Sequence, residues 1–194
     1  MKMTVARLVS LATTLCVILL LGRGASAQGI HDDHAAQGNH GGPGQADTGL
    51  VREVREATRP FLDVYAAMRA NYNQFLGCVS GTQEGAMGVH YVNGELVDGE
   101  LDASRPEALM YEMRNGRLSL LGVEYIVIAS AWDAKNPLPP ALLGQVFTYN
   151  TGPNRYGLPA FYALHVWAWR DNPNGTFVDW NPQVSCAQFV PDAQ

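Results

Sequence analysis

Two stretches of this sequence are apolar on both sides of the strand that each would form, and no other feature limits the fold as strongly. Side chains along a strand alternate between the two faces of a sheet. In residues 122–128 (GVEYIVI) and 161–169 (FYALHVWAW), both alternating sets are mostly aliphatic or aromatic. Such strands must be covered on both faces. This excludes a flat sheet with one face in water. It favours a half-open barrel or a cone-shaped sheet with a helix packed on one face.

An apolar pattern of helical period precedes these strands. Apolar residues recur there at intervals of three and four, which places them on one helix face: Leu50, Val54, Ala57, Phe61, Tyr65, Met68, Tyr72 and Phe75. Pro60 disfavours helical geometry at the residue before it. The pattern predicts a helix near 48–58, a break, and a second helix near 60–76 that ends at Gly77.

The rest of the chain has the pattern of strands joined by turns. Strands are predicted at 86–92, 109–113, 118–128, 143–149 and 161–169. The clearest turn is Asn115-Gly116, since Asn-Gly in a two-residue loop matches the twist of the flanking strands. Its register places Tyr111 opposite Leu120. The predicted fold class is α+β, with an N-terminal helical segment packed on a curved, mostly antiparallel sheet of about five strands.

The N-terminus has the pattern of an export signal. Lys2 and Arg7 precede an apolar run over 8–21, and an Ala-Ser-Ala cleavage pattern follows at 25–27. We therefore predict a signal peptide over residues 1–27, a flexible tail containing Gly and His over 28–46, and a single α+β domain over 47–194. No later stretch is long and apolar enough to span a membrane, so none is expected once the signal is removed.

Two cysteines follow the predicted signal, Cys78 and Cys186. Exported chains meet an oxidising environment, and an even number of cysteines favours one disulfide. The alternative, a reactive or metal-binding thiol, lacks a C-x-x-C pattern or a neighbouring histidine. We expect a bridge that closes most of the folded region.

Composition and motifs exclude several classes of protein. The 194 residues are 47% hydrophobic and 16% charged, which does not fit a disordered chain. A formal net charge of -5 disfavours a nucleic-acid partner. Nucleophile elbows, phosphate loops and dinucleotide fingerprints are absent from the sequence. No catalytic residue is assigned.

Three ionisable residues interrupt apolar strands, and they are the leading candidates for a site. Glu124 and His165 lie in the two apolar stretches, and His90 lies in the strand over 86–92. An unpaired buried carboxylate is costly, so Glu124 needs a partner or a proton. Two neutral imidazoles and a carboxylate can bind a divalent metal ion such as zinc or copper. The alternative is a structural contact of Glu124 with a His, Arg or Tyr inside the core.

Other polar residues give weaker signals. Glu112, on a neighbouring strand, is a weaker fourth member of the cluster, and Arg155, in a Gly- and Pro-containing loop, could meet an anion at a pocket mouth. In the tail, His31, His34 and His40 could hold a metal ion loosely, but a polar spacer that happens to contain histidines is the favoured interpretation.

Several short motifs resemble those of a group of uncharacterised bacterial exported proteins. They are GVHYVN at 88–93, RPE at 105–107, GVEY at 122–125, LHVW at 164–167, NPNG at 172–175 and DWNP at 179–182. The resemblance implies a protein of the bacterial periplasm or the extracellular space. It implies no activity and transfers no catalytic residue.

These observations leave three hypotheses for function. The first is an exported protein that binds a small molecule or a metal ion through His90, Glu124 and His165. The second is a metal-assisted or general acid–base enzyme that uses the same polar pocket. The third is a structural or partner-binding envelope protein in which the three residues only stabilise the core.

Overall fold

The computed structural model describes residues 48–191. The predicted signal peptide (1–27), the tail (28–46) and its three histidines lie outside the described residues. None of the helices within 48–191 is long and apolar enough to cross a membrane.

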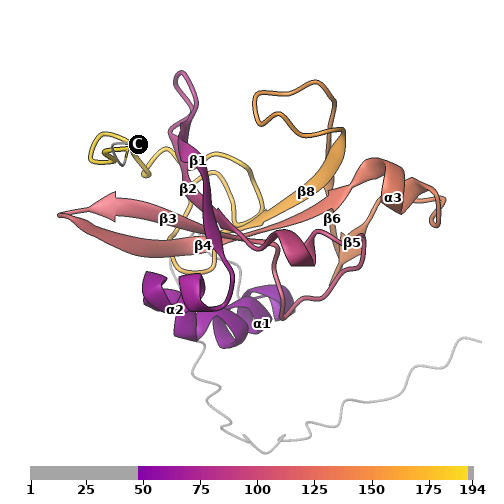
Figure 1. The fold of residues 1–194 in the computed structure, drawn as a ribbon, viewed down its shortest axis with the longest axis horizontal. Coiled ribbons are helices and arrows are strands. Elements are labelled where there is room, and N and C mark those ends of the chain that lie inside the picture. The colour runs from indigo at the N-terminus through magenta and orange to yellow at the C-terminus, as the bar shows by residue number, and fades with distance from the viewer. Residues whose placement is uncertain (1–47, 192–194) are drawn as a thin grey trace, which may run out of the picture. The chain divides into compact units, whose positions relative to one another are not determined.

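A strongly curled, six-stranded antiparallel sheet forms the framework (Figure 1). Its strand order is β1-β2-β3-β4-β8-β7. The strands are β1 (Asn73–Ser80), β2 (Ala86–Val92), β3 (Ala108–Arg114), β4 (Arg117–Ile128), β7 (Thr148–Asn150) and β8 (Phe161–Val166). The helices are α1 (Gly49–Thr58), α2 (Val64–Arg69) and α3 (Ala129–Asp133), with short 3-10 turns η1 (Arg59–Leu62) and η2 (Gly94–Leu96). The predicted α+β class with a curved sheet is confirmed.

The β3–β4 hairpin follows the predicted register. Asn115 and Gly116 both have positive φ, at 51° and 74°, as a two-residue turn of this kind requires. Tyr111 pairs with Leu120, and one step further along Met110 pairs with Gly122. Leu121 is therefore an extra residue, a β-bulge that changes which residues of β4 share a face with Met110.

One face of the sheet is covered by α1 and α2, and we call it the helix-covered face. In Figure 1 these helices lie below the sheet. Apolar side chains of the two helices pack there against alternate residues of β2, β3, β4 and β8; among them are Leu50, Val51, Val54, Ala67, Val89, Leu109, Val123, Tyr125, Leu164 and Val166. Tyr111 also donates its hydroxyl proton to the carbonyl of Phe61, at 2.7 Å.

The other face is covered by irregular chain, and we call it the loop-covered face. Residues 151–160 precede β8 and residues 167–190 follow it; most of both segments lies above the sheet in Figure 1. Val184 and Trp167 pack against Met110 and Leu121, while Leu158 packs on the cluster around Ile126. Loops thus provide the second cover that the two-sided apolar strands required.

A disulfide fastens the C-terminal segment to the first strand. Cys78 in β1 is bonded to Cys186, with the Cα atoms 5.6 Å apart, so the predicted bridge is confirmed. Close by, Glu112 accepts a hydrogen bond from the backbone N–H of Ser185 at 3.0 Å. Both contacts hold the end of the chain against the loop-covered face.

The second predicted helix is wrong in length and in its buried face. α2 ends at Arg69, and β1 begins at Asn73, within the range predicted to be helical. Asn71 has a φ of 66°, a left-handed conformation that ends the helix. Because the helical stripe is broken by the 3-10 turn at Pro60, Tyr65 is 67% exposed instead of buried.

Two strand predictions also need correction. The strand predicted over 143–149 is interrupted. Leu143 and Gly144, which both have positive φ, form the turn of a tight hairpin between β5 (Ala141–Leu142) and β6 (Gln145–Val146), and only residues 148–149 belong to β7 of the main sheet. The strand predicted over 161–169 ends at Val166. The chain turns there, with Ala168 N–H donating to the Val166 carbonyl at 2.9 Å, and Trp169 packs on the helix-covered face.

Candidate metal centre

Three neighbouring strands bring His90, Glu124 and His165 together on the loop-covered face. Glu124 of β4 lies directly opposite His165 of β8. His90 belongs to β2, which is separated from β4 by β3. The β3 residue opposite Glu124 is Ala108, which projects only a methyl group. The His90 ring can therefore reach over β3 to the carboxyl group.

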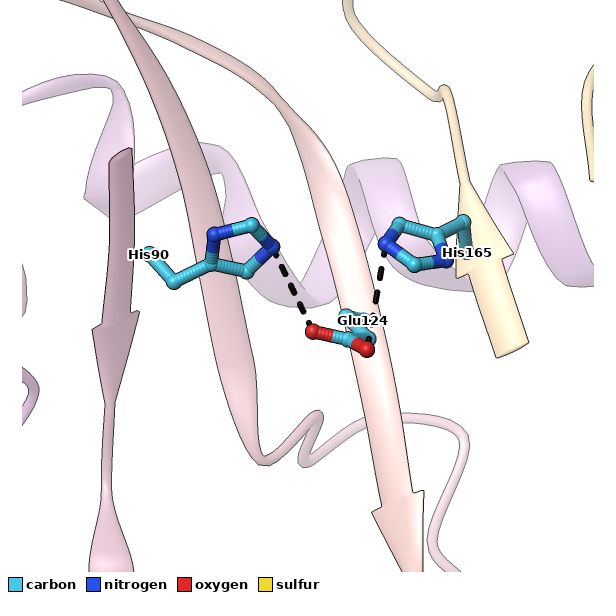
Figure 2. Close-up of side chains that lie close together, drawn as sticks. All are labelled: His90, Glu124 and His165. Atoms are coloured by element: carbon cyan, nitrogen blue, oxygen red, sulfur yellow. Dashed lines mark ion pairs between the residues drawn. The ribbon is translucent and has the colours of Figure 1, made fainter. Parts of the chain in front are cut away.

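The three side chains converge on one point (Figure 2). His90 Nε2 lies 3.3 Å from Glu124 Oε2, and His165 Nε2 lies 3.8 Å from Glu124 Oε1. One possible ligand atom from each of the three residues lies within 4.8 Å of the others. All three residues are buried, with 2–8% of their surface exposed.

His165 has a second carboxylate neighbour that the sequence analysis did not identify. Its Nδ1 lies 3.2 Å from Oδ1 of Asp179. Neither ring nitrogen of His165 makes a hydrogen bond of regular geometry within the described residues, although both are fully buried. A buried polar atom without a partner is costly, so its presence calls for an explanation.

Hydrogen bonds from two residues fix the segment that carries Asp179. Trp167 donates its indole N–H to the Val178 carbonyl at 2.6 Å. Asn172, which is only 1% exposed, donates to the Trp180 carbonyl at 3.0 Å. Asn172 of the NPNG motif thus holds in place the segment that contains Asp179 of the DWNP motif. Their short sequence spacing was the only signal that could have pointed to Asp179.

Burial and charge keep His90 neutral. Burial lowers its pKa, the charge of His165 lowers it further, and hydrogen bonding to the Gly88 backbone only partly opposes this, giving a value of about 3. Burial raises the pKa of Glu124, His165 lowers it, and Asp179 raises it, for a net increase. The His90–Glu124 contact drawn in Figure 2 is therefore made by an uncharged imidazole.

His165 behaves in the opposite way. Burial lowers its pKa, but Glu124 and Asp179 together outweigh burial, so the net pKa is raised. The hydrogen-bonding contact with His165 lowers the pKa of Asp179, against the opposing effect of burial. The cluster thus pairs an imidazole that stays neutral with one that favours a proton between two carboxylates.

A small cavity of about 30 Å³ borders His90 and Glu124. Apart from these two residues and the hydroxyl group of Tyr156, its lining is apolar: Phe75, Leu76, Val79, Met87, Val92, Ile126, Leu158 and Phe161. A cavity needs roughly 10–15 Å³ to hold one water molecule. This space therefore suits one or two waters or the head group of a ligand, and it is far below the roughly 300 Å³ of a typical small-molecule pocket.

The weaker candidates lie outside the cluster. Glu112 is buried, but its carboxylate binds Ser185 N–H and lies 3.7 Å from Arg114, so it serves the C-terminal segment. Arg155 is exposed and donates to the Ser80 carbonyl at 3.2 Å, which ties the 151–160 loop to β1. Its neighbour Tyr156, not Arg155, lines the cavity.

No family model, curated protein or solved structure matches this chain. The resemblance to bacterial exported proteins therefore stays a prediction, and the cluster itself is the main evidence for a function.

Proposed function

We propose that this protein binds a divalent transition-metal ion, zinc in the first instance, through His90, Glu124 and His165. The observation that carries the proposal is the convergence of two imidazoles and a carboxylate within 4.8 Å in a buried position. His165 Nε2 supports it, because this buried nitrogen makes no hydrogen bond within the described residues and a metal ion would complete its bonding.

The spacing of the ligand atoms supports a tetrahedral ion. Zinc–nitrogen bonds of 2.0–2.1 Å in a tetrahedron place neighbouring ligand atoms about 3.3 Å apart. The His90–Glu124 distance of 3.3 Å already meets this value. The His165–Glu124 distance of 3.8 Å requires only a small inward movement of the side chains. Three protein ligands leave a fourth position for water or another ligand.

The donor atoms select among metal ions. Imidazole nitrogen suits zinc, copper, nickel and iron, whereas calcium and magnesium prefer sites made of oxygen atoms. Asp179 adds the outer partner that ligating histidines usually have, since its carboxylate faces the other ring nitrogen of His165. We expect Zn²⁺ and Cu²⁺ to bind far more tightly than Mg²⁺ or Ca²⁺.

We also propose that the protein acts outside the cytoplasm, in the periplasm or the extracellular space. The Cys78–Cys186 disulfide supports this location, because such bonds form and persist in oxidising compartments. The N-terminal charge and hydropathy pattern supports it independently. Cell fractionation of the native protein tests it, and a purely cytoplasmic pool would contradict it.

Calorimetric titration of untagged protein with Zn²⁺ tests the metal site. The protein should carry His31→Ala, His34→Ala and His40→Ala, so that the tail cannot contribute; we call it the tail-substituted protein. We expect one equivalent of zinc to bind. Glu124→Gln in the same background should lose most of that affinity, since an amide is a poor zinc ligand.

The matched control is Glu112→Gln. Glu112 is also a buried glutamate of the loop-covered face but contacts Ser185 and Arg114, outside the cluster. It should bind zinc as the parent does. Absence of stoichiometric zinc, or equal losses for the two variants, would contradict the proposal. Asp179→Asn should bind zinc about 10–100-fold more weakly, as losses of outer partners do.

A second candidate function is metal-assisted hydrolysis at the same site. The cavity beside His90 and Glu124 favours it, because it offers room for a water molecule at the open metal position. Screening of the zinc-loaded protein against simple esters and amides tests it. Activity that persists after zinc is removed by a chelator would count against this candidate.

A further inference from the structure

We infer that the open metal position takes the carboxylate of an amphipathic molecule, whose apolar tail lies in a groove lined by residues of β1, β2 and β4 and of nearby loops. This inference rests on the proposed metal site and names its ligand. The groove has a volume of about 370 Å³ and is lined by Asn73, Gln74, Phe75, Val92, Gly94, Val97, Ile126, Ile128 and Leu158.

The groove and the small cavity are adjacent and share part of their walls. Phe75, Val92, Ile126 and Leu158 line both. A molecule whose head occupies the cavity beside Glu124 therefore has the groove next to it. Their volumes fit the two parts of an amphipathic ligand. The cavity of 30 Å³ suits a small polar head, and the groove of 370 Å³ suits an extended tail.

The charge of the site selects the head group. Among the ligands themselves, two neutral imidazoles and one carboxylate compensate only one of the two positive charges of a divalent ion, and the Asp179 carboxylate lies behind His165 and not at the ion. A buried charge of this kind is stabilised by a partner of opposite sign. A carboxylate supplies that charge and an oxygen ligand at once. Without the metal, the residues that line the cavity include no Lys or Arg that could bind a carboxylate, so binding should depend on the metal.

The lining of the groove selects the tail. Among the described residues that line it, Asn73 and Gln74 are polar and none is charged. Burial of each additional methylene there is favourable. A linear alkyl chain fits this lining better than a sugar or a peptide with charged side chains.

Two residues at the cavity fit a role in ligand binding. Tyr156 points its hydroxyl at the sulfur of Met87, 3.9 Å away, and thioether sulfur is a weak acceptor that a ligand oxygen could replace. Leu76 has a φ of 59°, an outlier for a bulky residue, at a bulge in β1. Bulges re-aim side chains next to binding sites, and this one places Leu76 in the cavity wall.

Titration of the tail-substituted protein, loaded with Co²⁺, tests the inference. Cobalt can replace zinc, and its visible spectrum reports a new ligand at the metal. We expect octanoate to change the spectrum and to bind at least about tenfold more tightly than acetate, because of its longer apolar chain. Octanol should bind weakly, and the chelator-treated protein should bind octanoate weakly as well.

Two variants separate the head of the ligand from its tail. Val97→Asp places a charge in the groove and should reduce the preference for octanoate over acetate at least fivefold, while cobalt binding is unchanged. Val190→Asp, at a residue that is 78% exposed, is the matched control and should change neither. Tyr156→Phe should weaken acetate and octanoate by the same factor, about two- to tenfold.

The outcomes distinguish the inference from the proposed function. If cobalt binds but octanoate is no better than acetate, or binds without a spectral change, the ligand assignment is wrong and the metal site stands. If cobalt does not bind with one-to-one stoichiometry, the metal site fails and the ligand assignment fails with it.

Discussion

The two faces of the curled sheet differ in what covers them and in what they bury. Helices cover one face, and the side chains packed there are almost all apolar. Irregular chain covers the other face, where His90, Glu124 and His165 lie among apolar residues. Regular helices pack tightly against a sheet, whereas loops are held by individual contacts. The comparison indicates that the helix-covered face supplies stability and the loop-covered face supplies the site.

Two buried glutamates show the same contrast. Glu107, beside Tyr72 and Tyr125 of the helix-covered core, accepts a hydrogen bond from the backbone N–H of Ile126 at 3.0 Å. The hydrogen-bond partner of Glu107 is therefore a backbone amide, whose position is fixed by the sheet. Glu124 has two imidazoles as partners instead, of which His165 favours a proton and both can bind a metal. The first glutamate is suited to a structural role and the second to a chemical one.

Removal of the disulfide should have the largest effect on stability. The bridge joins residues separated by 108 positions, and a loop of this size contributes about 4–5 kcal/mol in the chain-entropy model. Cys78→Ala with Cys186→Ala should therefore lower the free energy of unfolding by about that amount, measured by urea denaturation. Because the bridge anchors the loop-covered face, zinc affinity should also fall. Unchanged zinc affinity would contradict the inference that the loop-covered face is held in place by individual contacts such as this disulfide.

Among the substitutions, truncation of a side chain in the helix-covered core should have the next largest effect on stability. Leu109 is fully buried there. Leu109→Ala should destabilise the protein by about 3 kcal/mol, through lost burial and a new cavity. Zinc affinity of the folded protein should not change. Leu138→Ala, at a residue that is 73% exposed, is the control and should stay within about 0.5 kcal/mol of the parent.

Stability should fall as pH rises, because of Glu107. Burial raises the pKa of this carboxyl to about 8 from 4.5, its ordinary value, which the unfolded chain keeps. Folded protein then holds a proton that unfolded protein has lost, so the stabilisation is complete below pH 4.5 and is lost as pH rises through 8. The slope should reach about 1.4 kcal/mol per pH unit.

The isosteric variant Glu107→Gln tests this assignment. Its amide oxygen can still accept the Ile126 N–H but cannot titrate. Between pH 4.5 and 8, the free energy of unfolding, measured by urea denaturation, should fall less steeply with pH for the variant than for the parent, because Glu124 and His165, whose pKa values are also raised, still titrate in the variant. If the free energy of unfolding fell equally with pH for the parent and the variant, another group would be responsible for the pH dependence.

Substitution within the site should have the smallest effect on stability. Glu124→Gln keeps the size of the side chain and removes one carboxyl group from the cluster. No buried charge should be left without a partner, because His90 is neutral and Asp179 still faces His165, so we expect a change within about 1 kcal/mol in metal-free protein. Thermal denaturation with and without zinc measures it. A loss of several kcal/mol without zinc would mean that the cluster is structural and that both faces supply stability.

Local patterns predicted much of the framework. The Asn115-Gly116 turn fixed the register of β3 and β4 as far as the Tyr111–Leu120 pair, because turn chemistry acts over a few residues. Local patterns failed in the stretch that contains Tyr65. Its spacing is helical, but which side of a short helix is buried depends on how the chain enters and leaves it. The 3-10 turn before α2 and the left-handed residue after it decided that.

The sequence alone determined that both faces of this sheet must be covered and that His90, Glu124 and His165 interrupt apolar strands, because side-chain alternation is a local property of a strand. Only the tertiary structure decided that His90 reaches Glu124 over Ala108, and that Asp179 meets His165. These contacts depend on strand order and on the path of the chain after Val166. Such long-range geometry is set by the packing of the whole sheet and its covers, which no local pattern encodes.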